Sequence, residues 1–235
     1  MPKVFIGVGH GGRDPGAVGK VRESDANLVI ALKLRDELVR HGVTVGISRV
    51  RDENDDLSEE IKEANAFRPD IAIDVHNNAG GGDGFEALVQ TNGFAAKSRK
   101  LGQAIEKHVV ALGQRSRGMK IKKNSAGTAD YFGFLREVKA PAVIVEGFFV
   151  DSSDARGFDT IAEQQALGVA YAKGVLDYLG IVWRPDGADA FANAVDILYK
   201  NGIINSPAYW SRNGTYSTEN VRLLIQKVAE YIFNK

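Results

Sequence analysis

The feature that most constrains the fold of this chain is its alternation of short apolar runs with longer stretches whose apolar residues recur at helical spacing. This alternation is typical of α/β proteins, in which helices connect largely parallel strands. We therefore predict an α/β fold with a mostly parallel twisted sheet flanked by helices. The predicted strands are residues 4–8, 43–47, 71–75, 85–90 and 142–149, and the predicted helices are residues 28–38, 55–66, 95–112 and 161–179.

The pattern breaks near residues 181–187, where glycine and proline interrupt it. Beyond this break lie two amphipathic stretches, which predict a small C-terminal helical hairpin. We therefore expect a larger domain over residues 1–181 and a small helical domain over residues 186–235. A hairpin of about 50 residues buries too little surface to be stable alone, so it should dock on the larger domain, pair with a second copy or bind a partner.

The composition excludes several functional classes. Lysine and arginine number 30, and aspartate and glutamate also number 30, so the net charge does not indicate a nucleic-acid binder. Cysteine is absent, which excludes disulfides and thiolate zinc sites. A metal could be held only by histidine or carboxylate side chains, and the chain has only 4 histidines.

Neither a membrane partner nor an export signal is indicated. No apolar run approaches the roughly 20 residues that span a bilayer. The N-terminal residues lack the apolar core of a signal peptide, because glycine and charged residues follow the first short run. We expect synthesis in the cytoplasm without a signal peptide.

Three predicted strands lead to polar side chains at or near their carboxyl ends: His10, His76 and Glu146. Ligands of open α/β sheets bind beyond the carboxyl ends of the strands. If the three strands are parallel neighbours, the three side chains meet at one end of the sheet. Glu146 also stands inside an apolar run, and a buried carboxylate without a partner is costly.

Two histidines and one carboxylate are the ligand set of a hydrolytic zinc site. Glu23 is a second candidate carboxylate, because it follows a glycine-rich segment at the point where the first long helix should begin. Zinc needs three protein ligands, so the spare carboxylate can serve as a general base. The residues alone do not decide which glutamate has which role.

Residues 7–12 match the G-x-G-x-x-G pattern of dinucleotide-binding proteins. In that fold a helix must begin at these glycines. Here Pro15, Gly16 and Gly19 prevent a continuous helix, so we reject this interpretation. A phosphate-binding Gly-Lys-Ser/Thr motif and a Gly-x-Ser-x-Gly motif are both absent, which argues against a P-loop enzyme and a serine hydrolase.

Four separated motifs resemble, in order and spacing, the zinc-dependent N-acetylmuramoyl-L-alanine amidases of phage endolysins and bacterial autolysins. They are GHGGRDPGA at 9–17, Glu23, HNNA at 76–79 and PAVIVEGF at 141–148. The resemblance covers about residues 3–180. It implies a peptidoglycan hydrolase that cleaves the amide bond between N-acetylmuramic acid and L-alanine of the stem peptide.

The resemblance also implies roles for individual residues. His10, Glu23 and His76 would be ligands of Zn²⁺, and Glu146 would be the catalytic glutamate. Asn77, Leu135 and Arg136 would contact the substrate. One departure is visible, because the family often carries arginine in a Leu-x-x-Arg stretch before Ala-Asn. This chain has Leu-Ser-Glu-Glu at 57–60, which affects any salt bridge of that arginine but not the zinc site.

Two alternatives remain open at this stage. The first is a zinc peptidase that cuts within the stem peptide, and the second is a non-catalytic wall-binding module. The C-terminal stretch is faintly similar to helical wall-associated segments of lysins, so we expect cell-wall targeting or homodimer formation through these helices. Without a leader, the protein would act on the cell wall after release from the cell.

Overall fold

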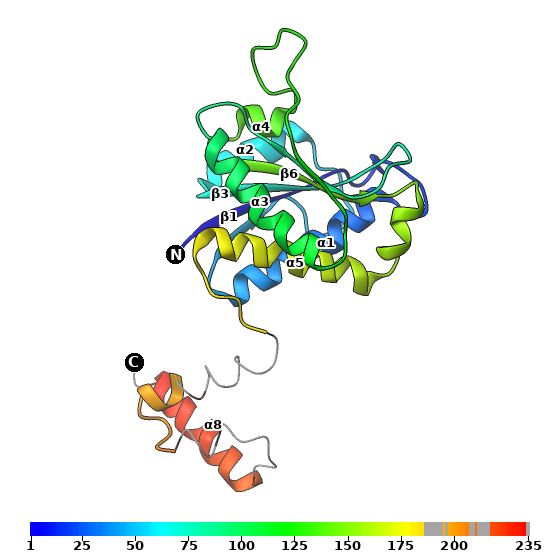
Figure 1. The fold of residues 1–235 in the computed structure, drawn as a ribbon. Coiled ribbons are helices and arrows are strands. Elements are labelled where there is room, and N and C mark those ends of the chain that lie inside the picture. The colour runs from blue at the N-terminus through cyan, green and yellow to red at the C-terminus, as the bar shows by residue number, and fades with distance from the viewer. Residues whose placement is uncertain (186–194, 196, 207–209, 211–216, 234–235) are drawn as a thin grey trace. The chain divides into compact units, whose positions relative to one another are not determined.

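The computed structural model describes residues 1–185, 195, 197–206, 210 and 217–233. The chain divides into two compact units, Met1–Trp183 and Arg184–Lys235, and each is described by itself. The predicted fold class is confirmed, because the first unit is an α/β structure with a mostly parallel sheet (Figure 1).

The sheet of the first unit has six strands in the order β2-β1-β3-β6-β4-β5. β1 pairs in parallel with β2 and β3, β3 with β6, and β4 with β5, whereas β4 and β6 are antiparallel. The sequence did not predict β5, an edge strand with little apolar content. The strands are β1 (Lys3–Val8), β2 (Thr44–Ile47), β3 (Ile71–Asn78), β4 (Phe85–Val89), β5 (Ser116–Lys120) and β6 (Ala142–Phe149).

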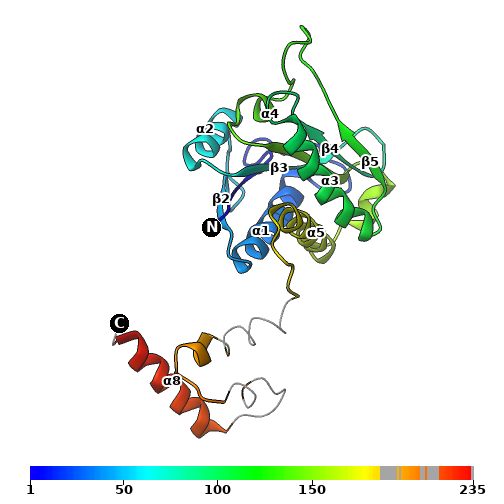
Figure 2. The same cartoon turned by 60° about the vertical axis from the view of Figure 1, so that its left-hand side comes forward.

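Helices cover both faces of this sheet, which explains the nearly continuous apolar runs of its central strands. Figure 2 shows α1 and α5 on one face and α2 and α4 on the other. Val4 of β1 packs with the first group and Phe5 with the second, as alternating side chains require. The helices are α1 (Glu23–Arg40), α2 (Leu57–Phe67), α3 (Ala95–Ala111), α4 (Gly133–Glu137) and α5 (Ile161–Leu179), with a 3₁₀ helix at Ser153–Gly157.

Local sequence signals fix the ends of the last helix of this unit. Thr160 accepts a hydrogen bond from the backbone N–H of Glu163, and the Glu163 side chain accepts one from the backbone of Thr160. This reciprocal pair satisfies two of the free N–H groups at the start of α5. Gly180 ends the helix with φ of 72°, a left-handed conformation that glycine adopts without strain.

The second unit contains α8 (Thr218–Phe233) and a small apolar core. Val195, Ile203 and Ile204 are buried there, with Leu224 and Val228 of α8 packed against them. In the first helix of the predicted hairpin, whose apolar stripe runs from 191 to 198, residues 191–194 and 196 lie outside the described residues. Throughout the described part of the chain, the helices lack the combination of length and apolarity that a membrane-spanning segment needs.

Candidate metal centre and the cavity beside it

The candidate site lies in the carboxyl-terminal halves of β3 and β6 and just beyond the end of β1. β1, β3 and β6 are adjacent and parallel, which is the condition under which His10, His76 and Glu146 converge. His76 and Glu146 stand opposite each other in the register of β3 and β6. Two residues after β1, His10 has a φ of 63°, so the chain turns sharply there. A Cβ on Gly9 would lie 2.1 Å from Cε1 of His76, so the absence of a side chain lets the two segments approach.

Glu23 completes a group of three potential metal ligands. It is the first residue of α1, and its side chain turns back toward the two histidines. Its Oε1 lies 3.2 Å from Nε2 of His10 and 3.2 Å from Nδ1 of His76. One ligand atom from each of the three residues lies within 4.8 Å of the others. Two imidazole nitrogens and one carboxylate oxygen at this spacing fit the donor set of a zinc site.

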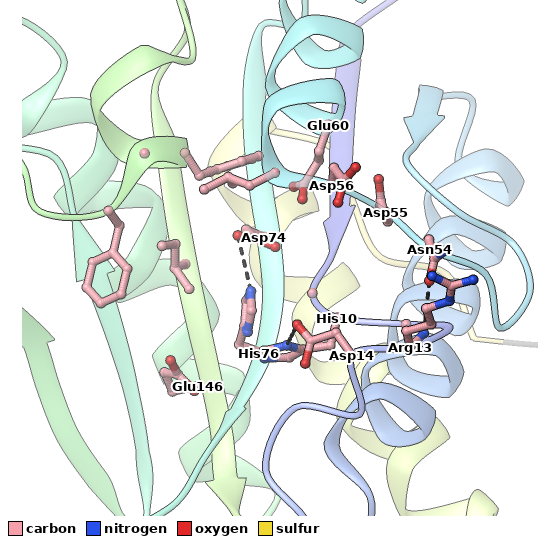
Figure 3. Close-up of a pocket in the computed structure, with 17 residues that line it drawn as sticks. His10, Arg13, Asp14, Asn54, Asp55, Asp56, Glu60, Asp74, His76 and Glu146 are labelled. Atoms are coloured by element: carbon pink, nitrogen blue, oxygen red, sulfur yellow. Dashed lines mark hydrogen bonds and ion pairs between the residues drawn. The ribbon is translucent and has the colours of Figure 1, made fainter.

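A second carboxylate lies behind each histidine (Figure 3). Nδ1 of His10 lies 2.8 Å from Oδ2 of Asp14, and Nε2 of His76 lies 3.3 Å from Oδ2 of Asp74. Such partners orient a ligand imidazole and raise its basicity. The sequence motifs did not indicate that either aspartate is a partner of a histidine. Asp74 could have been found, because it lies two residues before His76 in a strand and so shares its face of the sheet.

The pKa values of the two glutamates of the site are shifted in opposite directions. Burial opposes ionisation of Glu23, but hydrogen bonds from His10 and His76 outweigh it and hold the pKa of Glu23 well below its usual range. Burial raises the pKa of Glu146 to about 7, although the nearby His76 opposes this rise. Oε2 of Glu146 has no hydrogen-bond partner among the described residues. A carboxyl group with a pKa near neutrality is suited to accept and release a proton.

A cavity of about 680 Å³ opens beside this group. His10, His76 and Glu146 line one part of it (Figure 3). The rest is lined by the segment after β1, by the loop before α2 and the first turn of that helix, by residues 132–134, and by Asp74 and Ile144. Glu146 and the two histidines therefore border the same cavity.

The three predicted substrate contacts have other surroundings, and they are not among the described residues that line the cavity. Nδ2 of Asn77 donates to Oδ1 of Asn27 at 2.7 Å, and its backbone N–H donates to Glu23. Leu135 is buried in the core between α2, α4 and the sheet. Arg136 donates to the backbone carbonyls of residues 130 and 131. As substrate contacts, these three residues stay predictions.

An open α/β sheet that brings together a His–Glu–His group and a carboxyl with a pKa near neutrality is typical of metal-dependent hydrolases. Within this class, the chain belongs to the N-acetylmuramoyl-L-alanine amidase family, whose model matches residues 4–177. The family resemblance predicted from the four motifs is confirmed.

Relatives and solved structures agree with this assignment. The chain is 36% identical over 180 residues to the sporulation-specific N-acetylmuramoyl-L-alanine amidase of Bacillus subtilis (strain 168), covering 74% of this chain and 67% of the relative. It is 31% identical to the endolysin of Bacillus phage SPP1, over 79% of this chain and 69% of the relative. A crystal structure of an N-acetylmuramoyl-L-alanine amidase from Clostridium difficile 630 matches with a TM-score of 0.69 at 29% identity, over 77% of this chain and 97% of that one.

Proposed function

We propose that this protein is a peptidoglycan hydrolase that cleaves the amide bond between N-acetylmuramic acid and L-alanine of the stem peptide. The observation that carries the proposal is the His10–Glu23–His76 group beside the unpartnered carboxyl of Glu146. Family membership supports the choice of substrate.

In this proposal His10, Glu23 and His76 hold Zn²⁺. The fit rests on the donor types, on their spacing, and on the carboxylates of Asp14 and Asp74 behind the two imidazoles. Zinc in such a site supplies a Lewis acid for the scissile carbonyl and lowers the pKa of a water in its open position.

Glu146 is the proposed general base and acid. Its carboxylate takes one proton from the attacking water while the water oxygen bonds to the carbonyl carbon. The carbon–nitrogen bond then breaks, and Glu146 returns the proton to the departing nitrogen of L-alanine. The second proton of the water also passes to this nitrogen, so the products are the carboxylate of the muramic lactyl group and a peptide with a free N-terminal ammonium group. A pKa near 7 suits both transfers at neutral pH.

Digestion of purified peptidoglycan with mass analysis of the fragments tests this function. We expect release of peptides with an N-terminal alanine amine and no new reducing sugar ends. A zinc peptidase would instead release amines from within the stem peptide, and a wall-binding module would release none. Either of those results would contradict the proposal.

For the two units we propose separate tasks. Residues 1–181 carry catalysis, and residues 186–235 bind the cell wall or pair two copies of the chain. The relative named an endolysin supports action on the wall after release from the cell.

Truncation after Trp183 separates these tasks. Cleavage of small soluble muropeptides should change less than about twofold, because the metal centre and its cavity lie in the first unit. Sedimentation with intact walls should fall if the second unit is a targeting module. A shift of the full-length protein from dimer to monomer upon truncation would assign it to dimer formation. A large loss of muropeptide cleavage would contradict the division of tasks.

A further inference from the structure

One wall of the cavity carries three carboxyl groups. The proposed hydrolysis gives a role to Asp74 alone, as the partner of His76. We call Asp55, Glu60 and Asp74 the acidic wall. Glu60 is 3% exposed and Asp74 is 2% exposed, and Figure 3 shows both beside the cavity. Oδ2 of Asp55, Oε1 of Glu60 and Oδ1 of Asp74 are buried and lack a hydrogen-bond partner among the described residues.

The unpartnered oxygens of Glu60 and Asp74 lie around one point above the backbone of β1. A Cβ built on Gly7 would lie 2.0 Å from Oε1 of Glu60 and 2.8 Å from Oδ1 of Asp74. The missing side chain of Gly7 leaves the space in which both carboxyl groups are accommodated. The two carboxyl groups are therefore close neighbours that share one buried space.

His76 contacts Asp74 of this wall, but no lysine or arginine among the described residues forms an ion pair with its three carboxyl groups. Arg13 is the only lysine or arginine among the described residues that line the cavity, and it is exposed. The buried guanidinium of Arg49 attracts Asp55 electrostatically, but it donates its hydrogen bonds to backbone carbonyls such as those of residues 8, 9 and 24. Buried carboxylates without partners are unfavourable. Burial and the neighbouring Asp74 and Asp55 accordingly raise the pKa of Glu60 well above its usual range.

The spacing of the carboxylates in the acidic wall favours an organic cation over a metal ion. Within the described residues, His10, Glu23 and His76 form the only group of three or more histidine or carboxylate donors close enough to share a metal. An ammonium group has three donors that can be divided between separate carboxylates. The cavity also offers apolar contacts to a carbon chain from Leu57, Phe134 and Ile144.

We propose that the acidic wall binds a primary ammonium group of the substrate, with Glu60 as its main partner. This inference rests on the proposed function, because the same cavity contains Glu146 and the two histidines. Two parts of peptidoglycan carry such a group. One is the side chain of a diamino acid in the stem peptide, and the other is an amino sugar that lacks its acetyl group.

Equilibrium binding to the zinc-loaded full chain tests the proposal. The ligands are muramoyl tripeptides with lysine as third residue, in which the lysine amine is either free or acetylated. A second pair keeps the lysine acetylated and differs only in a free or acetylated sugar amine. Glu146→Gln prevents turnover during titration calorimetry. In one of the two pairs, the member with the free ammonium should bind on the order of tenfold more tightly than the acetylated member. The pair that shows this difference tells whether the acidic wall binds the lysine amine or the sugar amine.

Variants of α2 connect this preference to the acidic wall. Glu60→Gln, added to the Glu146→Gln chain, should abolish the preference for the free ammonium. Glu63→Gln is the matched control, because it removes the same charge from an exposed position of the same helix and should keep the preference. Equal binding of both members in both pairs would overturn the proposal. So would a preference that survives Glu60→Gln.

Failure of the proposed function gives a different result. If the unmodified protein cleaves neither member of any pair, the amidase assignment is wrong, while the binding preference and its dependence on Glu60 still decide the ammonium site. If cleavage occurs but acetylation changes neither binding nor the response to Glu60→Gln, only the ammonium site is wrong.

Discussion

Glu23 and Glu60 are almost equally buried, at 4% and 3% exposed, yet the pKa of the first is lowered and that of the second is raised. Glu23 accepts hydrogen bonds from the imidazoles of His10 and His76. Glu60 instead faces Asp74 and Asp55. Burial alone therefore does not determine whether a carboxyl group carries charge, because its partners decide. In the two proposals, Glu23 serves as a metal ligand, whereas Glu60 lacks a cation that the substrate would supply.

The largest predicted effect is that of metal removal on the rate of hydrolysis. Exhaustive chelation should lower the rate of amine release from peptidoglycan by at least about a thousandfold, because activation of water and carbonyl is lost. Dialysis against zinc should restore the rate. Activity that persists after chelation would show that Glu23 and the histidines do not serve as metal ligands for the reaction.

Substitution of Glu146 should come next in size. Glu146→Gln should lower kcat by about 10²- to 10⁴-fold, because the amide cannot carry the proton. Its zinc content, measured by elemental analysis, should stay at one ion per chain, whereas His10→Ala and His76→Ala should lose zinc. If Glu146→Gln loses zinc and Glu23→Gln keeps it, the two glutamates have exchanged roles.

Asp74 takes part in both groups of residues. Its Oδ2 contacts His76, and its Oδ1 lies near Glu60 within the acidic wall. Asp74→Asn should weaken zinc binding by about tenfold through loss of the carboxylate behind His76. Competition with a chromogenic chelator measures this change without relying on activity. Glu60→Gln serves as the control and should leave zinc affinity within about twofold. Equal losses in both variants would mean that the acidic wall supports the metal and is not a separate site.

The smallest effects should appear in stability, with opposite signs for the two buried glutamates. In metal-free protein at pH 7, Glu23→Gln should lower the free energy of unfolding by about 2 kcal/mol, because charged hydrogen bonds are lost. Glu60→Gln should raise it by about 1 kcal/mol, because no buried carboxyl remains to be kept protonated or unpaired. Urea unfolding measures both, with Glu63→Gln expected within about 0.5 kcal/mol of the unmodified chain.

The raised pKa of Glu60 also determines how the stability gain of Glu60→Gln varies with pH. Below the ordinary pKa of glutamate, folded and unfolded chains are both protonated at this position, so Glu60→Gln should give no gain. As pH rises, the unfolded chain ionises first, because the folded pKa is raised. The gain should therefore grow with pH until the folded carboxyl also ionises. A gain that decreases with rising pH would contradict the raised pKa.

Much of this arrangement could be predicted from the sequence, because the ends of apolar strands mark the rim of an α/β sheet. His10, His76 and Glu146 were placed by that rule alone, and the start of α1 at Glu23 followed from the glycine-rich segment before it. The division of roles between Glu23 and Glu146 came only from the family resemblance.

Other features depend on packing between distant segments. β5 (Ser116–Lys120) has no apolar run, and it is a strand because the edge of β4 pairs with it. The acidic wall combines a loop, a helix and a strand, and Glu60 acquires its surroundings only when α2 packs over Gly7. In the sequence, Glu60 shows only that an expected arginine is absent.

The pairing of His76 with Glu146 across β3 and β6 has a consequence for how such a protein can change. Their separation is set by the hydrogen-bond ladder between two inner strands, roughly 4.8 Å apart in any sheet. A slip of one residue would turn one side chain to the opposite face, so drift in that alignment is not tolerated. The positions of the turns and helices around the rim are not fixed by such a hydrogen-bond ladder. Substitutions there can therefore change substrate preference while His76 and Glu146 keep their spacing.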